Sequence, residues 1–360
     1  MAFTFDPNTL DFHGDEKRDA SQAVFTAAFS NPELAELHEI IEDIVVDTQI
    51  PIIGGLNNQV GLGDNSCEQG REDNSIPMSQ KKWTPKPISG RLPFCWKTLE
   101  PTFWAWGLKA GLEKADLEGS EFINFIGEKL VEKLKEMLLR VSYFSNTTID
   151  TITNGGILTN GTPLAYFNKI DGFFAQIDAI IAADSTRLTS SILTTRNAAA
   201  TYALQAFTAT DTTNRVVTKA LQEVRFGADM RLRASETLRY EVTLSVADQY
   251  ERELLAAEIP YSVERMENGV KVLKSAGIEL IVLDFLDRMK VEFFNDGTRI
   301  HEPHVIILST KTNMPVATQN AGTFTEYSVL YDPIEKEILV DFATELDAKI
   351  IEDHMIQVAK

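Results

Sequence analysis

The side chains best suited to bind a metal are two histidines, His301 and His304, in the stretch "HEPH". A proline lies between them, in a segment that we predict to be a turn. Zinc sites need three or four ligands that converge on one point, and no cysteine or further histidine lies close to this pair in the sequence. We therefore interpret both as ordinary loop histidines and expect no metal cofactor.

Other motifs that carry chemistry are incomplete. The stretch "GLGDNS" (61–66) lacks the third glycine of a dinucleotide-binding fingerprint, and no helix is predicted to follow it. The sequence contains no GxSxG, HExxH or Walker motif. Its two cysteines, Cys67 and Cys95, form no CxxC pair, so we interpret them as free thiols. We expect neither catalysis nor a cofactor, although an active site assembled from distant residues stays an alternative.

A local run of positive charge is the most distinctive chemical feature. No acidic residue occurs between Asp73 and Glu100, although the chain of 360 residues has a net charge of −19. The cations in this interval are Lys81, Lys82, Lys86, Arg91 and Lys97. Such a run is usually a solvated face, and the alternative is a surface that docks on acidic groups of a partner. The overall negative charge argues against tight, sequence-independent binding of nucleic acid.

The same region, residues 47–98, is rich in glycine and proline, and this density of helix breakers excludes a helix. Short alternations of apolar and polar residues at its two ends predict a long two-stranded excursion. A two-stranded hairpin alone in water is marginally stable. We therefore expect the excursion to need a partner surface.

All four tryptophans lie between residues 83 and 106. Trp96 and Trp104 stand where the excursion rejoins the body of the chain, and Trp104 opens an apolar helix face that Leu108 continues. We expect Trp96, Trp104 and Leu108 to anchor the root of the excursion. Trp83 lies among lysines and prolines, where its ring either contacts a partner subunit or packs across the hairpin.

Helical periodicity is clear in several segments. A helix is predicted over residues 30–45, and a longer one from Ser120 to Tyr143 has an apolar stripe that includes Leu134 and Leu138. Three glutamates lie off that stripe: Glu121, Glu128 and Glu132. Further helices are predicted near residues 163–182, 213–234 and 245–257, the last opened by a capping box in "SVAD".

Strands are predicted mainly in the second half of the chain, at residues 238–244, 278–285, 291–294, 304–308 and 337–342. The segment 184–213 is placed only loosely, and the last segment, "DAKIIEDHMIQVA", fits a helix and a strand equally. No apolar run approaches the roughly 20 residues that cross a bilayer. The first residues do not form a secretory signal, so we expect a cytoplasmic protein with no membrane partner.

The order of these parts resembles that of the major capsid proteins of tailed bacteriophages, which have the Hong Kong 97-type coat fold. Three stretches carry the residue-level likeness and are similar to coat proteins of phages that infect Bacteroides-like hosts. They are "YFNKIDGFFAQI" (166–177), "SVADQYERELLAAEIPYSVERMENGVKVLKSAGIELIVLDFLDRM" (245–289) and "LSTKTNMPVATQ" (308–319). The resemblance implies an α+β fold with an N-terminal arm, an extended β-hairpin loop, a peripheral domain with a long spine helix, and an axial α/β domain.

The resemblance also implies the boundaries of these parts. The N-terminal arm and helix would occupy residues 1–46 and the extended loop residues 47–98. The peripheral domain would occupy 99–165 together with a C-terminal strand in 331–360, and the axial domain 166–330. In this family the extended loop lies on the peripheral domain of a neighbouring subunit, which would supply the partner surface that the excursion needs.

The function implied is that of a structural protein, not an enzyme. Subunits of this family form pentamers and hexamers, which close into an icosahedral shell around double-stranded phage DNA in the virion, after assembly in the host bacterial cytoplasm. Scaffolding, portal and decoration proteins are possible partners, and the packaged DNA would be contacted weakly and non-specifically. Two alternatives stay open: another virion protein such as a tail tube or sheath subunit, or a soluble α/β enzyme without a recognisable motif.

With this resemblance, the basic run becomes a set of inter-subunit contacts. We expect Lys81, Lys82, Trp83, Lys86 and Arg91 of the loop to meet a neighbour's spine helix. The acidic side chains that would receive them are Glu121, Glu128 and Glu132. On the sequence alone, Trp83→Ala should then weaken assembly more than it weakens the fold of the subunit.

Overall fold

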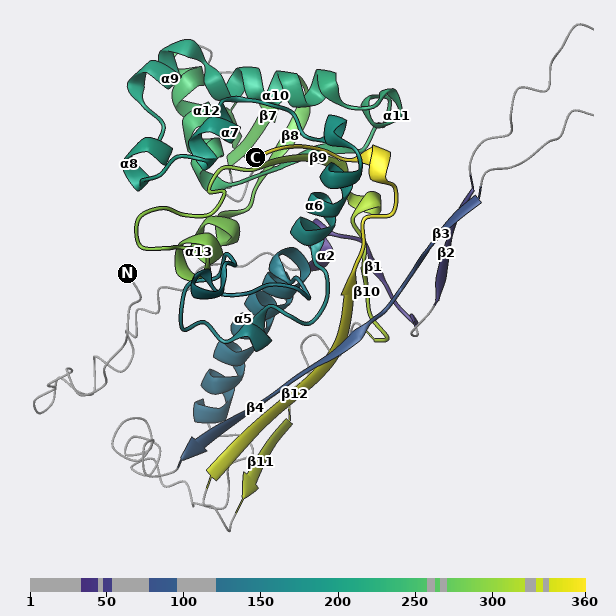
Figure 1. Cartoon of the computed structure of the whole chain (residues 1–360). Helices are drawn as coiled ribbons and strands as arrows, with labels where there is room; N and C mark the ends of the chain where they lie inside the picture. Colours follow the sequence, from purple (N-terminus) through teal and green to yellow (C-terminus); the bar gives the residue numbers. More distant parts are fainter. Residues whose placement is uncertain are drawn as a thin grey trace, which may run out of the picture.

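The chain folds around two β-sheets and one long helix, and a two-stranded hairpin lies to one side of them (Figure 1). The computed structural model describes residues 34–44, 48–53, 78–95, 121–257, 263–265, 271–320, 328–332 and 337–360.

The α-helices are α2 (Leu34–Leu37), α5 (Glu121–Phe144), α6 (Phe173–Ala183), α7 (Ile192–Asn197), α8 (Tyr202–Gln205), α9 (Ala209–Asn214), α10 (Val216–Gly227), α11 (Met230–Arg233), α12 (Leu244–Ala256) and α13 (Asp284–Phe293). The strands are β1 (Ile40–Ile41), β2 (Gln49–Ile53), β3 (Met78–Lys82), β4 (Lys86–Cys95), β5 (Leu238–Val242), β6 (Val263–Arg265), β7 (Lys271–Ser275), β8 (Ile278–Val282), β9 (Ile306–Thr310), β10 (Val316–Ala317), β11 (Ser328–Asp332), β12 (Glu337–Ala348) and β13 (Gln357–Ala359).

A six-stranded sheet lies in the upper part of the molecule in Figure 1, with the strand order β13-β9-β5-β8-β7-β6. β5 and β8 are parallel, and the other neighbours are antiparallel. Every residue of β9 is buried, which is typical of a strand covered on both faces. Leu221 of α10 and Val246 of α12 share an apolar core with Tyr240 of β5. The last strand of the chain, β13, therefore belongs to this sheet.

The second sheet is built around β12. β4 pairs with it over ten residue pairs, from Glu337↔Cys95 to Leu346↔Lys86. β11 pairs with its opposite edge, and β10 pairs with its end and also with β1. Gly90 faces Phe342 in the β4–β12 ladder, and a Cβ atom at Gly90 would lie 2.4 Å from the phenyl ring. A larger residue at this strand position would therefore displace the ring of Phe342.

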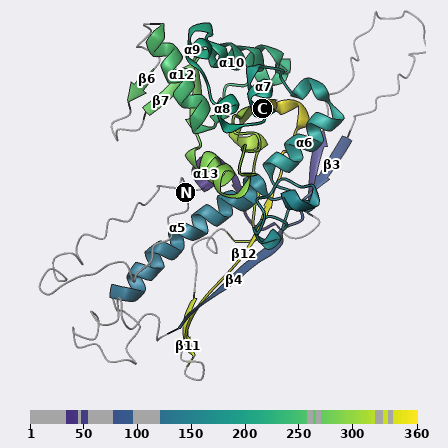
Figure 2. The ribbon, with the colours of Figure 1, turned by 60° about the vertical axis from the view of Figure 1, so that its left-hand side comes forward.

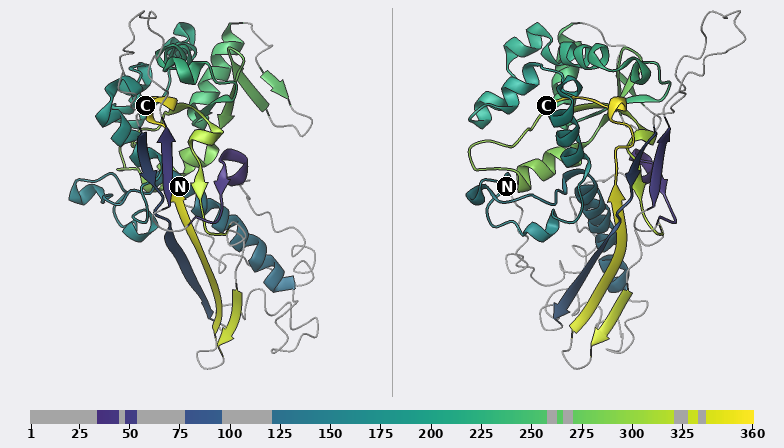
Figure 3. Two further views of the ribbon diagram at one scale, coloured as in Figure 1. Left: turned by 90° about the vertical axis from the view of Figure 1, so that its right-hand side faces the viewer. Right: turned by 45° about the vertical axis from the view of Figure 1, so that its right-hand side comes forward.

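The hairpin of β2 and β3 forms a sheet of its own, with a register from Gln49↔Lys82 to Ile53↔Met78. In Figure 1 it lies at the right, on the side of the molecule away from α8, and the right-hand view of Figure 3 shows it again at the edge of the body. Figure 2 shows α5 and the β4–β12 ladder extending below the six-stranded sheet.

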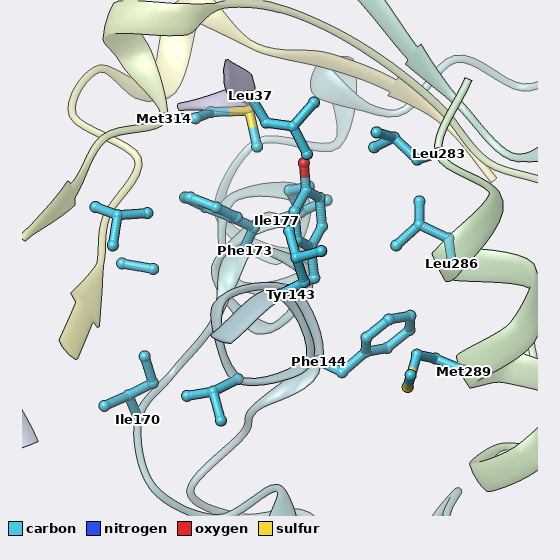
Figure 4. Close-up of a cluster of buried hydrophobic side chains, with 14 of the residues drawn as sticks. Leu37, Tyr143, Phe144, Ile170, Phe173, Ile177, Leu283, Leu286, Met289 and Met314 are labelled. Atoms are coloured by element: carbon cyan, nitrogen blue, oxygen red, sulfur yellow. The ribbon is translucent and has the colours of Figure 1, made fainter. Parts of the chain in front are cut away.

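The larger apolar core lies between α5, α6 and α13, with Tyr143 and Phe173 near its centre (Figure 4). The ring of Tyr143 meets those of Phe173 and Phe285 edge to face, each with a centroid distance of 5.2 Å. Leu37 of α2 and Met314 pack in the same core. Segments far apart in the sequence are thus joined around the C-terminal end of α5.

Several predictions of the elements are confirmed. The long helix is α5, where Leu134 and Leu138 are buried as its apolar stripe requires. The two-stranded excursion predicted over 47–98 is confirmed in part: β2 pairs with β3, whereas residues 86–95 form β4 of the second sheet. β5 lies within the strand predicted at 238–244, and β12 includes the one predicted at 337–342. Among the described residues, no helix is both long and apolar enough to cross a membrane.

Other predictions of the elements are wrong. The helix predicted over 30–45 ends at Leu37, because Ile40 and Ile41 pair in parallel with β10. Residues 291–294 were expected to be a strand and instead end α13, whose first turn contains Asp284 and Asp287. The capping box in "SVAD" does not form, because a carboxylate of α13 caps α12 instead. The last segment, which the sequence left open between a helix and a strand, begins with the end of β12 and continues through a 3-10 turn to β13.

Candidate functional site

The base of the β2–β3 hairpin is packed against the body of the chain by Trp83. Its side chain is 2% exposed and lies in a small apolar cluster with Ile41, Ile44, Ile50 and Ala317. A ring of this size buries enough apolar surface to hold two elements together. The contacts that the structure gives Trp83 lie within its own chain, and its role between subunits stays a prediction.

Trp83→Ala should lower the free energy of unfolding of the isolated subunit by about 3 kcal/mol, because removal of a buried tryptophan leaves a cavity in a cluster with few other members. Chemical denaturation of the subunit measures this loss. Hydrogen exchange should also become faster in β2 and β3. Wild-type stability together with impaired assembly would show instead that the ring acts mainly between subunits.

Two polar contacts also hold the hairpin base. The ammonium of Lys81 donates to the backbone oxygen of Ile350 and pairs with the carboxylate of Asp353, each at 2.6 Å. The backbone N–H of Thr84 donates to the carboxylate of Asp347 at 2.7 Å. The hairpin base is therefore docked on the end of β12 and the segment that follows it.

The other predicted loop residues lie near this base or outside the described part of the chain. Lys82 and Lys86 are exposed. Arg91 is opposite Asp341 in the β4–β12 ladder, and its side chain lies outside the description. The three residues predicted to anchor the loop root also lie outside the described residues: Trp96, Trp104 and Leu108. Their role stays a prediction.

The predicted acidic face lies on α5. Glu132 is half-buried, and one residue further Lys133 pairs with Glu136 at 2.9 Å. Glu121 and Glu128 lie in the first third of the helix, where the description does not extend to side chains. Basic and acidic residues thus alternate along this helix. A contact between its glutamates and the loop of a neighbouring subunit stays a prediction.

A buried polar network connects α2, α5 and the six-stranded sheet. The hydroxyl of Tyr143 donates to Oε2 of Glu241 at 2.8 Å and accepts from Nε2 of His38 at 2.8 Å. The other carboxylate oxygen of Glu241 accepts from Arg239 at 2.5 Å. All four residues are at most 8% exposed. Burial lowers the pKa of His38 to about 4 and raises that of Tyr143, so both groups are neutral at pH 7.

A pocket of about 350 Å³ lies between α8, the start of α12 and α13. In its wall the hydroxyl of Ser245 donates to Nδ1 of His304 at 2.8 Å, and Nε2 donates to the backbone oxygen of Gln205 at 2.9 Å. A serine and a histidine in this geometry resemble a nucleophile and its base. However, the amides of Leu244 and Ser245 both donate to Asp287, so they are not available to an oxyanion. The pair instead joins α8 to α12.

The two histidines of "HEPH" belong to different polar clusters. His304 lies in the pocket wall, whereas His301 lines a separate cavity of about 50 Å³ with Lys290 and Glu302. The ammonium of Lys290 donates to the backbone oxygen of Glu302, and burial lowers its pKa to about 8. Within the described residues, no group of three or more potential ligands is arranged to hold a metal ion.

No protein-family model matches the chain, and no curated protein matches it. Among solved structures, one titled "Mycobacterium phage Ogopogo" is similar with a TM-score of 0.52 at 10% identity, over 94% of each chain. A chain from the satellite phage P4 procapsid has a TM-score of 0.48 at 9% identity, over 92% of this chain and 95% of that chain. The likeness to the first covers almost the whole chain and, at this identity, shows a shared fold. The protein therefore has the Hong Kong 97-type coat fold that its sequence predicts.

Proposed function

We propose that this protein is a major capsid protein, which assembles with copies of itself into pentamers and hexamers of an icosahedral shell around double-stranded phage DNA. Its place would be the virion capsid, after assembly in the bacterial cytoplasm. Scaffolding, portal and decoration proteins are further partners in this proposal. The coat fold supports it, and the net charge of −19 suits an inner wall that does not bind DNA tightly.

The observation that carries the proposal is the β2–β3 hairpin. Among the described residues its strands pair only with each other, and a two-stranded sheet alone in water is marginally stable. Its base is fixed by Trp83 and Lys81. A docked base below two strands that, among the described residues, pair with no third strand is suited to a lever that is completed by a neighbouring subunit.

The proposal is tested by electron microscopy and sedimentation velocity of the purified, full-length protein. Rings with fivefold and sixfold symmetry, or closed shells, are the expected products. Rods would indicate a tail-tube or sheath subunit and would contradict the proposal. The proposal would also be contradicted if the protein stayed a small, discrete oligomer in all conditions in which comparable coat proteins form shells.

Reversal of charge at the hairpin base should impair assembly without destabilising the folded subunit. Lys86→Glu should reduce the yield of shells at least tenfold and leave the unfolding free energy of the subunit within about 0.5 kcal/mol of wild type, because the side chain of Lys86 is exposed. One exposed ion pair contributes at most about 1 kcal/mol, but a shell repeats each contact in every subunit. Lys81 is left intact, because its ammonium holds the hairpin to its own chain.

Lys169→Glu, an exposed reversal remote from the hairpin in the sequence, is the matched control. It changes the net charge in the same direction and should assemble normally. Normal shells from Lys86→Glu would show that this basic side chain does not contribute to the contact between subunits.

A further inference from the structure

One end of the axial α/β region presents apolar and cationic side chains with little cover. Phe226, at the end of α10, is 63% exposed, and Met230, at the start of α11, is 80% exposed. Arg233 lies over the ring of Phe226 at 5.6 Å, and the side chain of Arg231 is 72% exposed. Aromatic, methionine and arginine side chains are enriched in protein interfaces. We call these four residues the α11 tip.

The pocket between α8, α12 and α13 has the complementary chemistry. Tyr202, which lines the pocket, and its neighbour Leu204 are 41% and 56% exposed. Two carboxylates, of Asp248 and Asp287, lie in the pocket lining, and Asp248 is exposed. Gln249 is buried in the same lining, and its Oε1 has no hydrogen-bond partner among the described residues. We call this site, with Leu204 at its rim, the α8 socket.

The socket contains more than one kind of charge, and the balance decides what it can bind. Among the described residues that line it, Arg252 is the single cation, against the two carboxylates. Burial lowers the pKa of His304 to about 4, so that its ring is neutral at pH 7. The lining is therefore negative overall. An apolar side chain accompanied by a guanidinium would match the exposed ring of Tyr202 and the carboxylates.

The tip and the socket lie at opposite ends of the same layer. In Figure 1, α11 is at the right and α8 at the left, and α10 lies between them. Two complementary surfaces on opposite sides of one subunit form a head-to-tail contact, and such contacts close into rings when the rotation between subunits permits. A tip cannot reach the socket of its own chain in this arrangement, so the matching occupant is a second copy.

We propose that the α11 tip of one subunit docks in the α8 socket of the next, with Met230 and Phe226 against Tyr202 and Leu204 and with Arg233 facing Asp248. This inference rests on the proposed function, because it identifies the surfaces through which subunits form a ring. Its basis is the pairing of exposed apolar groups and opposite charges at two ends of the described chain. Burial of these large side chains on docking supplies the main driving force, and the charges set the register.

The test uses the full chain under conditions in which the wild type forms rings or shells. Met230→Asp and Leu204→Asp should each reduce the ring fraction at least tenfold in sedimentation velocity, and the subunits should keep wild-type thermal unfolding because both residues are exposed. Leu255→Asp is the matched control, because Leu255 is 66% exposed and lies outside both surfaces. It should assemble as the wild type does.

Charge exchange gives a second, independent readout. Arg233→Asp and Asp248→Arg should each weaken ring formation, and the two changes in one chain should restore it at least in part, because the pair is then reversed and not broken. Assembly of Met230→Asp and Leu204→Asp at the wild-type level, or failure of the exchange to restore rings, would overturn the inference. If the wild type itself formed neither rings nor shells, the proposed function would fail. If the wild type assembles and the variants of the tip and socket assemble equally well, only this inference fails, so the two failures are distinguishable.

Discussion

Glu241→Ala should lower the free energy of unfolding by about 3–5 kcal/mol. The carboxylate is 2% exposed and receives hydrogen bonds from Arg239 and Tyr143. Its removal leaves a buried guanidinium without a counter-charge and a buried hydroxyl without an acceptor, and both penalties exceed the value of an ordinary hydrogen bond. Urea denaturation at pH 7 measures the loss. A change below about 1 kcal/mol would show that the network contributes little to the stability of the subunit.

Two further variants show whether the loss comes from unpaired groups or from the cavity. Arg239→Met combined with Glu241→Leu removes both charges and should cost less than Glu241→Ala alone, because a buried ion pair can often be replaced by apolar side chains of similar volume. Tyr143→Phe removes the hydroxyl that joins His38 to Glu241 and should cost about 1–3 kcal/mol. Glu236→Ala, at an exposed position nearby in the sequence, is the control and should change the unfolding free energy by less than about 0.5 kcal/mol.

Some elements of the fold could be predicted from the sequence, and others could not. The helix α5 was predicted because Leu134 and Leu138 repeat at the helical period on one face, and that signal is local. Ile40 and Ile41 lie within an equally regular apolar pattern, yet they form a strand because β10 offers backbone partners that the local pattern cannot show. Periodicity reports which residues are buried more reliably than it reports the element that buries them.

The polar clusters could not be predicted from the sequence, for a related reason. His38, Tyr143 and Glu241 come from three segments separated by about a hundred residues each, and no local pattern distinguishes them from other polar residues. Ser245 looked like a helix cap, but Asp287 of another helix fills that role and leaves the hydroxyl to bond His304. Glycine and proline density, by contrast, predicted the part of the excursion formed by β2 and β3, because turn chemistry and the exclusion of helix are local properties. The same density could not show that residues 86–95 pair with β12.

Acidification from pH 7 to pH 5 should destabilise the subunit by about 4 kcal/mol. Burial lowers the pKa of both His38 and His304 to about 4, from an ordinary value of 6.5. Below pH 6.5 these two histidines therefore bind protons in the unfolded chain but not in the folded chain. Their contribution to the free energy of unfolding is complete above pH 6.5 and is lost as the pH falls toward 4. Each histidine contributes about 2 kcal/mol of this loss at pH 5. Burial also lowers the pKa of His301, which acts in the same direction.

Urea denaturation at pH 7, 6 and 5 measures this dependence, and substitutions identify its source. His38→Gln and His304→Gln keep a side chain that can donate or accept a hydrogen bond but does not titrate, so each should remove about half of the slope, even if it lowers stability at pH 7. Burial raises the pKa of Asp287 and Asp347, so their proton uptake in the folded chain partly offsets the loss near the lower end of the window. Equal stability at pH 7 and pH 5 would mean that these imidazoles are accessible to protons in the folded subunit. Because the buried polar network then could not be closed to solvent, that result would also lower the loss expected for Glu241→Ala.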